Sequence, residues 1–115
     1  MYTIVWAYKV SPEKRSEFEK IYAADGAWAK LFKKGKGYLG TDLIHSAVVP
    51  ENYATVDNWE SEADYEAFLA RWRDEYEKLD QQCQGLTEEE SCLGRFGNGF
   101  SSHGKDTDSS ENQVL

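Results

Sequence analysis

His45 and Asn58 are the polar side chains whose chemistry and position best suit proton transfer or substrate polarisation. His45 is the only histidine before Ser101, and it lies in an apolar, β-branched run. Its imidazole changes charge near neutral pH, so it could act as a base or orient an oxygen intermediate. The amide of Asn58 could donate a hydrogen bond to a substrate carbonyl. We take both as candidate catalytic residues, although each could instead satisfy local backbone groups or an interface.

Aromatic residues are abundant: the chain has five Phe, four Trp and seven Tyr. Many of them recur at spacings of three and four, which places rings on one face of a helix. Such rings could stack on a flat aromatic compound, or they could only fill the core. Four of them are taken as candidate substrate-binding residues: Tyr22, Trp28, Phe68 and Trp72.

Several classes of function are excluded by what the sequence lacks. It has no CxxC, HExxH, GxGxxG, GxxxxGK[ST] or GxSxG motif, so we expect no metal, nucleotide or other cofactor and no serine hydrolase. The formal net charge of −8 argues against nucleic acid or an anionic membrane as a partner. The N-terminus does not resemble a signal peptide, which predicts a cytoplasmic protein. Cys83 and Cys92 could pair, but reduced thiols are expected there.

Hydrophobic periodicity and turn signals predict four strands and two helices. "SPEK" opens the first helix, with Ser11 as its cap, and Asp25-Gly26 interrupts it. Ser61 and Asp64 open the second in a variant of the capping box, and Thr87 with Glu90 predicts one short helical turn. The predicted strands cover 2–10, 38–49, 53–59 and 92–100, and the predicted helices cover 12–32 and 61–79.

The order strand, helix, strand, strand, helix, strand is that of the ferredoxin-like split βαβ fold, an α+β arrangement with an antiparallel sheet and two helices on one face. The predicted strands carry large apolar residues at the positions that point to either face of the sheet. The face without helices therefore also needs a cover. A second copy of the chain would supply it, which predicts a homodimer through the sheet faces. Residues 1–100 are expected to form this domain, and residues 101–115 a disordered acidic tail.

The segments "SPEKRSEFEKIY", "GYLGTDLIHS", "YATVDNWESEADYEAF" and "LGRF" resemble the antibiotic biosynthesis monooxygenase (ABM) family, within the dimeric α+β barrel superfamily. The resemblance implies a pocket between helices and sheet. Family members include cofactor-independent oxygenases of polycyclic aromatic compounds and haem-degrading enzymes. The positions that resemble the haem-degrading pattern hold Val5 or Trp6, Phe68 and Lys78, which offer no ring nitrogen to ligate iron, so haem degradation is not expected.

The resemblance implies a cofactor-independent monooxygenase-type domain acting on a small aromatic compound, quinol-like or anthrone-like, in the helix–sheet pocket. Because a fold does not confer an activity, a non-catalytic small-ligand-binding or stress-related homodimer of the same fold is the alternative. An isomerase or decarboxylase of small cyclic substrates is a third reading.

Overall fold

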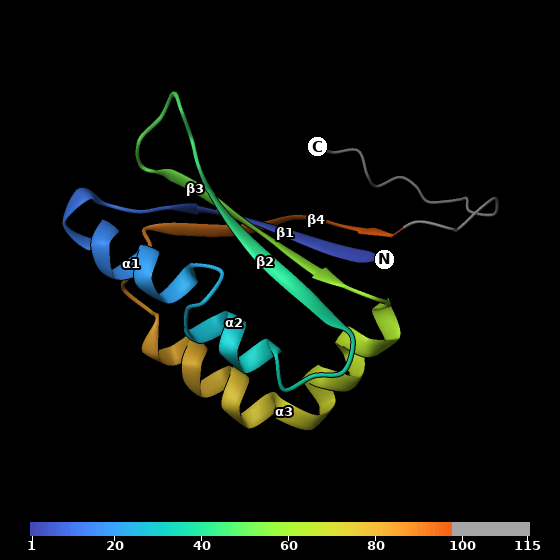
Figure 1. Ribbon diagram of the computed structural model, residues 1–115. Coiled ribbons are helices and arrows are strands. Elements are labelled where there is room, and N and C mark those ends of the chain that lie inside the picture. The colour runs from blue at the N-terminus through green and yellow to red at the C-terminus, as the bar shows by residue number, and fades with distance from the viewer. Residues whose placement is uncertain (98–115) are drawn as a thin grey trace.

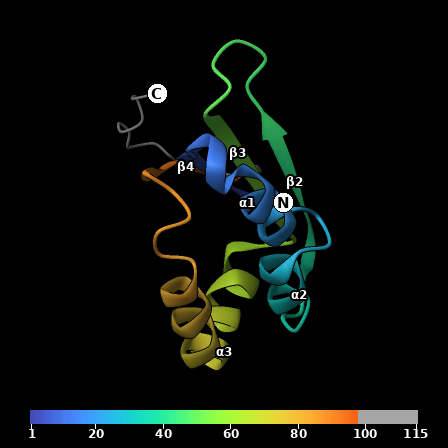
Figure 2. The ribbon, with the colours of Figure 1, turned by 90° about the vertical axis from the view of Figure 1, so that its left-hand side faces the viewer.

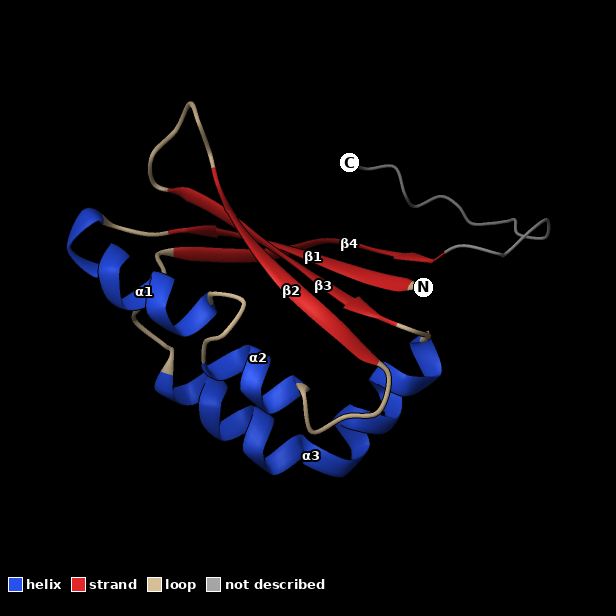
Figure 3. Ribbon diagram, in the orientation of Figure 1, coloured by secondary structure: helices blue, strands red, loops and turns tan. Residues whose placement is uncertain are grey.

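A four-stranded antiparallel sheet with the strand order β2-β3-β1-β4 forms one layer of the molecule, and the helices form the other. The computed structural model describes residues 1–97 (Figures 1 and 3). The predicted tail after residue 100 and the end of the last predicted strand lie outside the described residues. The α+β, ferredoxin-like fold is confirmed. Its elements are β1 (Tyr2–Lys9), the 3-10 helix η1 (Pro12–Lys14), α1 (Arg15–Tyr22), α2 (Ala27–Phe32), β2 (Tyr38–His45), β3 (Asn52–Trp59), α3 (Glu62–Gln82) and β4 (Glu89–Gly97).

The first helical region is divided into α1 and α2, as the Asp25-Gly26 pair predicts. The chain passes so close to α1 at this point that a Cβ on Gly26 would lie 2.3 Å from the carbonyl oxygen of Ile21. Only glycine fits there without moving the backbone. The break sets α2 apart from α1, so that Trp28 reaches α3, where its ring meets that of Tyr76 edge to face at 5.1 Å between centroids.

Helix α3 begins where its capping sequence predicts. Ser61 Oγ accepts a hydrogen bond from the Asp64 backbone N–H at 3.1 Å, which satisfies one of the unpaired donors of the first turn. The helix bends at Trp72, whose φ of −114° and ψ of 27° are not helical. Figure 2 shows the helices on one side of the sheet.

Two predictions differ from the structure in more than the exact end of an element. Strand β2 ends at His45 rather than Val49, because Ser46 Oγ accepts the backbone N–H groups of Val48 and Val49 and turns the chain. The short helical turn predicted at Thr87–Glu90 does not form. Instead the Glu88 N–H donates to the Lys9 carbonyl at 2.7 Å, and the chain joins β1 as β4 from Glu89 onward.

The helix-facing side of the sheet carries the core, in two clusters. We call the first the packed cluster and the second the pocket-side cluster. The packed cluster consists of Tyr2, Ile4, Leu31, Phe32, Trp59, Tyr65 and Phe68. The pocket-side cluster consists of Tyr8, Val10, Phe18, Tyr22, Tyr53, Cys83 and Leu86.

The opposite face of the sheet is open in the described chain. Val5 and Val56 pair across it, Ile44 is 53% exposed and Phe96 is 45% exposed. No helix of residues 1–97 is both long and apolar enough to cross a membrane. Cys83 is buried, Cys92 is exposed, and both are free thiols.

Candidate functional site

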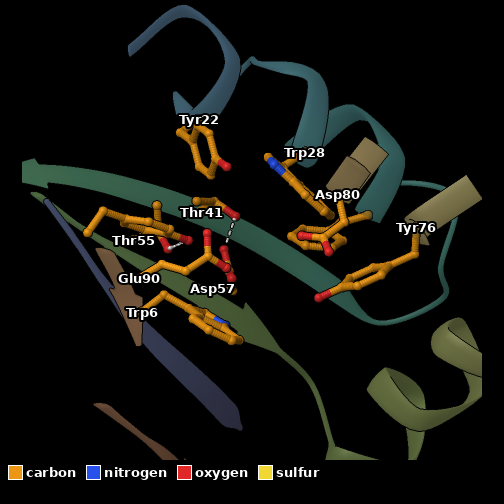
Figure 4. A pocket seen from close by; sticks show the side chains of 11 residues that line it. Trp6, Tyr22, Trp28, Thr41, Thr55, Asp57, Tyr76, Asp80 and Glu90 are labelled. Carbon is orange, nitrogen blue, oxygen red and sulfur yellow. Dashed lines mark hydrogen bonds between the residues drawn. The ribbon is translucent and has the colours of Figure 1, made fainter. Parts of the chain in front are cut away.

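A cavity of about 170 Å³ lies between the helices and the sheet, in the half of the molecule occupied by the pocket-side cluster (Figure 4). Strands β1, β2, β3 and β4 and helices α1, α2 and α3 all contribute side chains to it. Rings form most of the walls, and hydroxyl and carboxyl groups lie among them. The lining residues are Trp6, Tyr8, Tyr22, Trp28, Phe32, Thr41, Thr55, Asp57, Tyr76, Asp80 and Glu90.

Asp57 supplies a buried carboxyl group to this cavity. The residue is only 7% exposed, and Thr41 Oγ1 donates a hydrogen bond to Asp57 Oδ1 at 2.6 Å. Because the Thr41 proton is used in this way, the Tyr38 hydroxyl must be the donor of the 2.6 Å bond to Thr41 Oγ1. Burial raises the pKa of Asp57 to about 6, against the opposite effect of the Thr41 hydrogen bond. A carboxyl group with such a pKa can accept a proton near neutral pH.

The alternation of β3 explains why Asp57 lies inside and Asn58 does not. Side chains on a strand point to opposite faces in turn, and Thr55, Asp57 and Trp59 are all buried on the helix side. Asn58 therefore lies on the open face, where its Oδ1 accepts a hydrogen bond from Thr3 Oγ1 at 2.7 Å. The structure does not place Asn58 in the cavity.

Three tyrosines offer hydroxyl groups to the cavity. Tyr8 shares a hydrogen bond of 3.2 Å with Thr55 Oγ1. Burial is the main cause that raises the pKa values of Tyr8, Tyr22 and Tyr76 well above the ordinary value, so all three stay protonated and can donate. The indole N–H of Trp28 is buried and has no partner at good hydrogen-bond geometry, although it lies close enough to the Tyr22 hydroxyl and the Cys83 thiol to lower the pKa of each. A ligand acceptor placed beside it would satisfy that donor.

Two further carboxyl groups, those of Asp80 on α3 and Glu90 on β4, line the same cavity and are exposed. They therefore lie at its rim rather than on its floor. Burial raises the pKa of Glu90, and the nearby negative charge of Asp80 adds to this effect. Sequence reasoning missed both, because they come from separate elements that only the tertiary fold brings together.

His45 lies outside the cavity, at the exposed end of β2. Its ring stacks on Tyr53 with 4.1 Å between centroids, and its Nε2 lies 2.6 Å from the Pro50 carbonyl oxygen. A carbonyl can only accept, so Nε2 carries a proton in this contact. The geometry places His45 beside the β2–β3 turn, in contact with Tyr53 and Pro50, neither of which lines the cavity.

The four candidate rings are divided by the structure. Tyr22 and Trp28 line the cavity, with 6.3 Å between their ring centroids. Phe68 is 2% exposed and belongs to the packed cluster. Trp72 lies toward the surface, where Lys34 Nζ is 4.8 Å from its ring centroid. The structure brings only Tyr22 and Trp28 together around the cavity.

Comparison with solved structures shows the same fold in proteins of low sequence identity. SnoaB, a cofactor-independent oxygenase from Streptomyces nogalater, matches in a mutant form with a TM-score of 0.69 and 19% identity, over 84% of this chain and 90% of that one. A candidate antibiotic biosynthesis monooxygenase from Deinococcus radiodurans matches with a TM-score of 0.70 and 12% identity, over 89% and 96% of the two chains. MhuD, in a mutant form with two manganese protoporphyrin IX molecules bound per active site, matches with a TM-score of 0.62 and 20% identity, over 90% and 100%.

Among curated proteins, no sequence matches this chain. A family model does match, and it covers residues 1–71, which include β1, β2, β3 and the buried Asp57. The match confirms the family expected from the sequence segments quoted above. The chain belongs to the antibiotic biosynthesis monooxygenase family.

Proposed function

We propose that this domain is a cofactor-independent monooxygenase that acts on a small electron-rich aromatic compound, quinol-like or anthrone-like, in the helix–sheet cavity. The observation that carries the proposal is a buried carboxyl group, Asp57, among aromatic rings. Family membership and the fold shared with SnoaB support the class of reaction. Rings of Tyr22 and Trp28 would hold a flat substrate by stacking.

In this reaction Asp57 is the general base. Its carboxylate takes a proton from the substrate, and the resulting electron-rich anion reduces molecular oxygen. One oxygen atom enters the product and the other leaves as water with two hydrogens of the substrate, so the substrate supplies all four electrons that molecular oxygen accepts. The tyrosine hydroxyls and the Trp28 N–H are the donors available for the developing oxyanion. The aromatic walls and the burial of Asp57 would limit the access of competing water to the anion.

Oxygen consumption by the full chain tests this proposal. With a panel of hydroquinones and anthrones, turnover should proceed without added metal or flavin and should be insensitive to chelators. Asp57→Asn should lower kcat by about 10²-fold or more, the usual scale for a general base. His45→Ala is the matched control and should keep full turnover, since His45 does not line the cavity. A folded Asp57→Asn variant with normal turnover would rule out the proposed base.

A non-catalytic ligand-binding protein is the second candidate, and one observation favours it. An oxygenase of this type develops negative charge on its substrate, yet three of the lining residues are acidic. If compounds of the panel bind but none consumes oxygen, the binding function replaces the catalytic one.

We also propose that two copies associate through the open faces of their sheets. Val5, Val56, Ile44 and Phe96 form an apolar surface that nothing covers within residues 1–97. Sedimentation at micromolar concentration should give about twice the 13.1 kDa chain mass. Ile44→Glu together with Phe96→Glu should give a folded monomer, whereas a wild-type monomer would contradict the proposal.

A further inference from the structure

The cavity has an unbalanced charge. Three of its eleven lining residues are acidic, namely Asp57, Asp80 and Glu90, and none is Lys, Arg or His. Within residues 1–97 no ion pair neutralises these three carboxyl groups: Lys9 pairs with Glu88 at 3.8 Å and Arg73 with Glu77 at 3.9 Å. A ligand in this cavity therefore meets negative charge without a compensating protein cation.

The three carboxyl groups surround the cavity rather than meet at one point. Asp57 projects from β3 at the floor, Asp80 from α3 and Glu90 from β4 at the rim (Figure 4). All three act on the Tyr76 hydroxyl, where they add to the effect of burial in raising its pKa. No group of three acidic, His or Cys side chains in the described chain could hold a metal ion. The negative potential of the three carboxyl groups therefore suits a positive charge carried on an organic molecule better than a metal ion.

The aromatic rings that line the cavity also favour an organic ligand with a positive charge. The face of an aromatic ring is electron-rich and attracts an ammonium group, most strongly for tryptophan. Trp6 and Trp28 both line the cavity, and Tyr76 packs edge to face on Trp28 with 5.1 Å between centroids. Aromatic faces combined with carboxylates recognise protonated amines through cation–π attraction and charge together.

The size of the cavity limits the ligand to about one ring. A dry protein cavity of about 150 Å³ holds benzene, and this cavity measures about 170 Å³. We propose that the cavity selects a single-ring aromatic compound that carries a protonated amine. This rests on the proposed function in using the same cavity. It narrows the substrate class to a single-ring phenol or hydroquinone with an amine substituent, and it excludes the three-ring anthrones of that proposal. The ammonium would offset the negative charge that deprotonation leaves on such a substrate.

Binding of three probes of one shape tests the inference without any catalytic readout. Benzylamine, benzyl alcohol and benzoate are cationic, neutral and anionic at neutral pH. Calorimetry on the full chain should show benzylamine binding at least about 10-fold more tightly than benzyl alcohol, the scale of one screened charge interaction, and benzoate binding most weakly. If benzyl alcohol or benzoate binds as tightly as benzylamine, or if no probe binds, the inference is wrong.

The rim carboxyl groups give the matched variants. Asp80→Asn with Glu90→Gln should weaken benzylamine binding by about 10-fold and leave benzyl alcohol unchanged, because shape is kept and charge is lost. Asp74→Asn with Glu89→Gln removes the same charge from α3 and β4 at exposed positions outside the lining, and should leave the preference intact. Equal weakening of amine and alcohol would overturn the charge argument. A preference for the amine without oxygen consumption would overturn the oxygenase proposal alone.

Discussion

At one end of the helix–sheet interface Trp59, Phe32 and Phe68 meet ring to ring, whereas at the other end Tyr8, Tyr22 and Trp28 stand around a cavity. The helices supply rings to both ends. The sheet beneath them differs, since Ile4 and Trp59 fill the packed end. At the other end the sheet contributes the short polar side chains of Thr41, Thr55 and Asp57 beside the rings of Trp6 and Tyr8, and the short side chains leave the space of the cavity. The residues of the sheet therefore decide whether a helical ring becomes core or cavity wall.

Truncating one ring at each end gives the largest expected difference. Phe68→Ala should lower the free energy of unfolding by about 3–5 kcal/mol, because it removes a fully buried ring from close-packed neighbours. Trp28→Ala should cost less, since that ring already borders empty space and is partly exposed. Urea unfolding followed by far-UV circular dichroism measures both. Equal losses would mean that the cavity end is packed as tightly as the other.

Asp57, at the cavity end, should lower the free energy of unfolding when its carboxyl group is ionised. The pKa of Asp57 rises on folding from 3.8 to about 6, so the folded state holds its proton more tightly than the unfolded state. Stability should therefore fall as pH rises from about 4 to about 6 and then level off. Asp57→Asn should recover up to about 3 kcal/mol at about pH 8 and almost nothing at about pH 4.

Thermal unfolding at the two pH values measures this gain. Asp42→Asn is the control, because Asp42 is an exposed acid on the adjacent strand β2. It should change stability equally little at both pH values. A loss of stability in Asp57→Asn at the higher pH would show that the carboxylate is held by interactions stronger than its cost of burial.

How much of this the sequence could reveal depends on how local each feature is. The Ser61 cap and the break at Gly26 were predictable because their causes lie within a few residues. Asp57 could have been found, since it lies two residues before Trp59, a large ring at the end of the predicted strand 53–59, and so shares its face. Instead the sequence directed attention to Asn58, which faces the other way.

Other features needed the tertiary structure. Glu90 was interpreted as part of a helix start, and only the pairing of Tyr8 with Glu90 across β1 and β4 brings it to the cavity. The division of the rings was not predictable either. Phe68 and Trp28 have the same kind of spacing, and only the strand residues opposite them distinguish core from lining.

Close packing at the packed end can be tested by a substitution at Gly35. A Cβ on Gly35 would lie 3.0 Å from Phe68 Cβ and 3.1 Å from the Trp59 ring. Gly35→Ala should therefore cost roughly 1–3 kcal/mol through overpacking. Phe68→Ala keeps the Cβ of Phe68 but removes its Cδ1, which would also lie 3.0 Å away. In that background the same substitution should therefore cost less, and a double-mutant cycle of urea unfolding measures the coupling. If the two losses in the free energy of unfolding are purely additive, the strain caused by Gly35→Ala does not arise from its contact with Phe68.

Tyr38 connects the two ends and gives the smallest effect. Its ring packs on Trp59 with 5.2 Å between centroids, and its hydroxyl donates to Thr41, which in turn donates to Asp57. A hydroxyl that accepts one hydrogen bond becomes a better donor in the next, so Tyr38 supports the ionised form of Asp57 indirectly. Tyr38→Phe should keep the packing and raise the pKa of Asp57 further above its value of about 6, by a few tenths.

Carbon-13 NMR titration of the aspartate carboxyl groups would follow that pKa directly, and the acidic limb of the pH–rate profile should move in the same direction. Tyr53→Phe is the matched control, because the Tyr53 hydroxyl donates to Glu19 and takes no part in the bonds to Asp57. It should leave the Asp57 titration in place. If both variants shift the titration equally, the change arises from general loosening of the sheet. If Tyr38→Phe shifts nothing, the Thr41 hydrogen bond alone supports the carboxylate, and the packed end influences the cavity only through its shape.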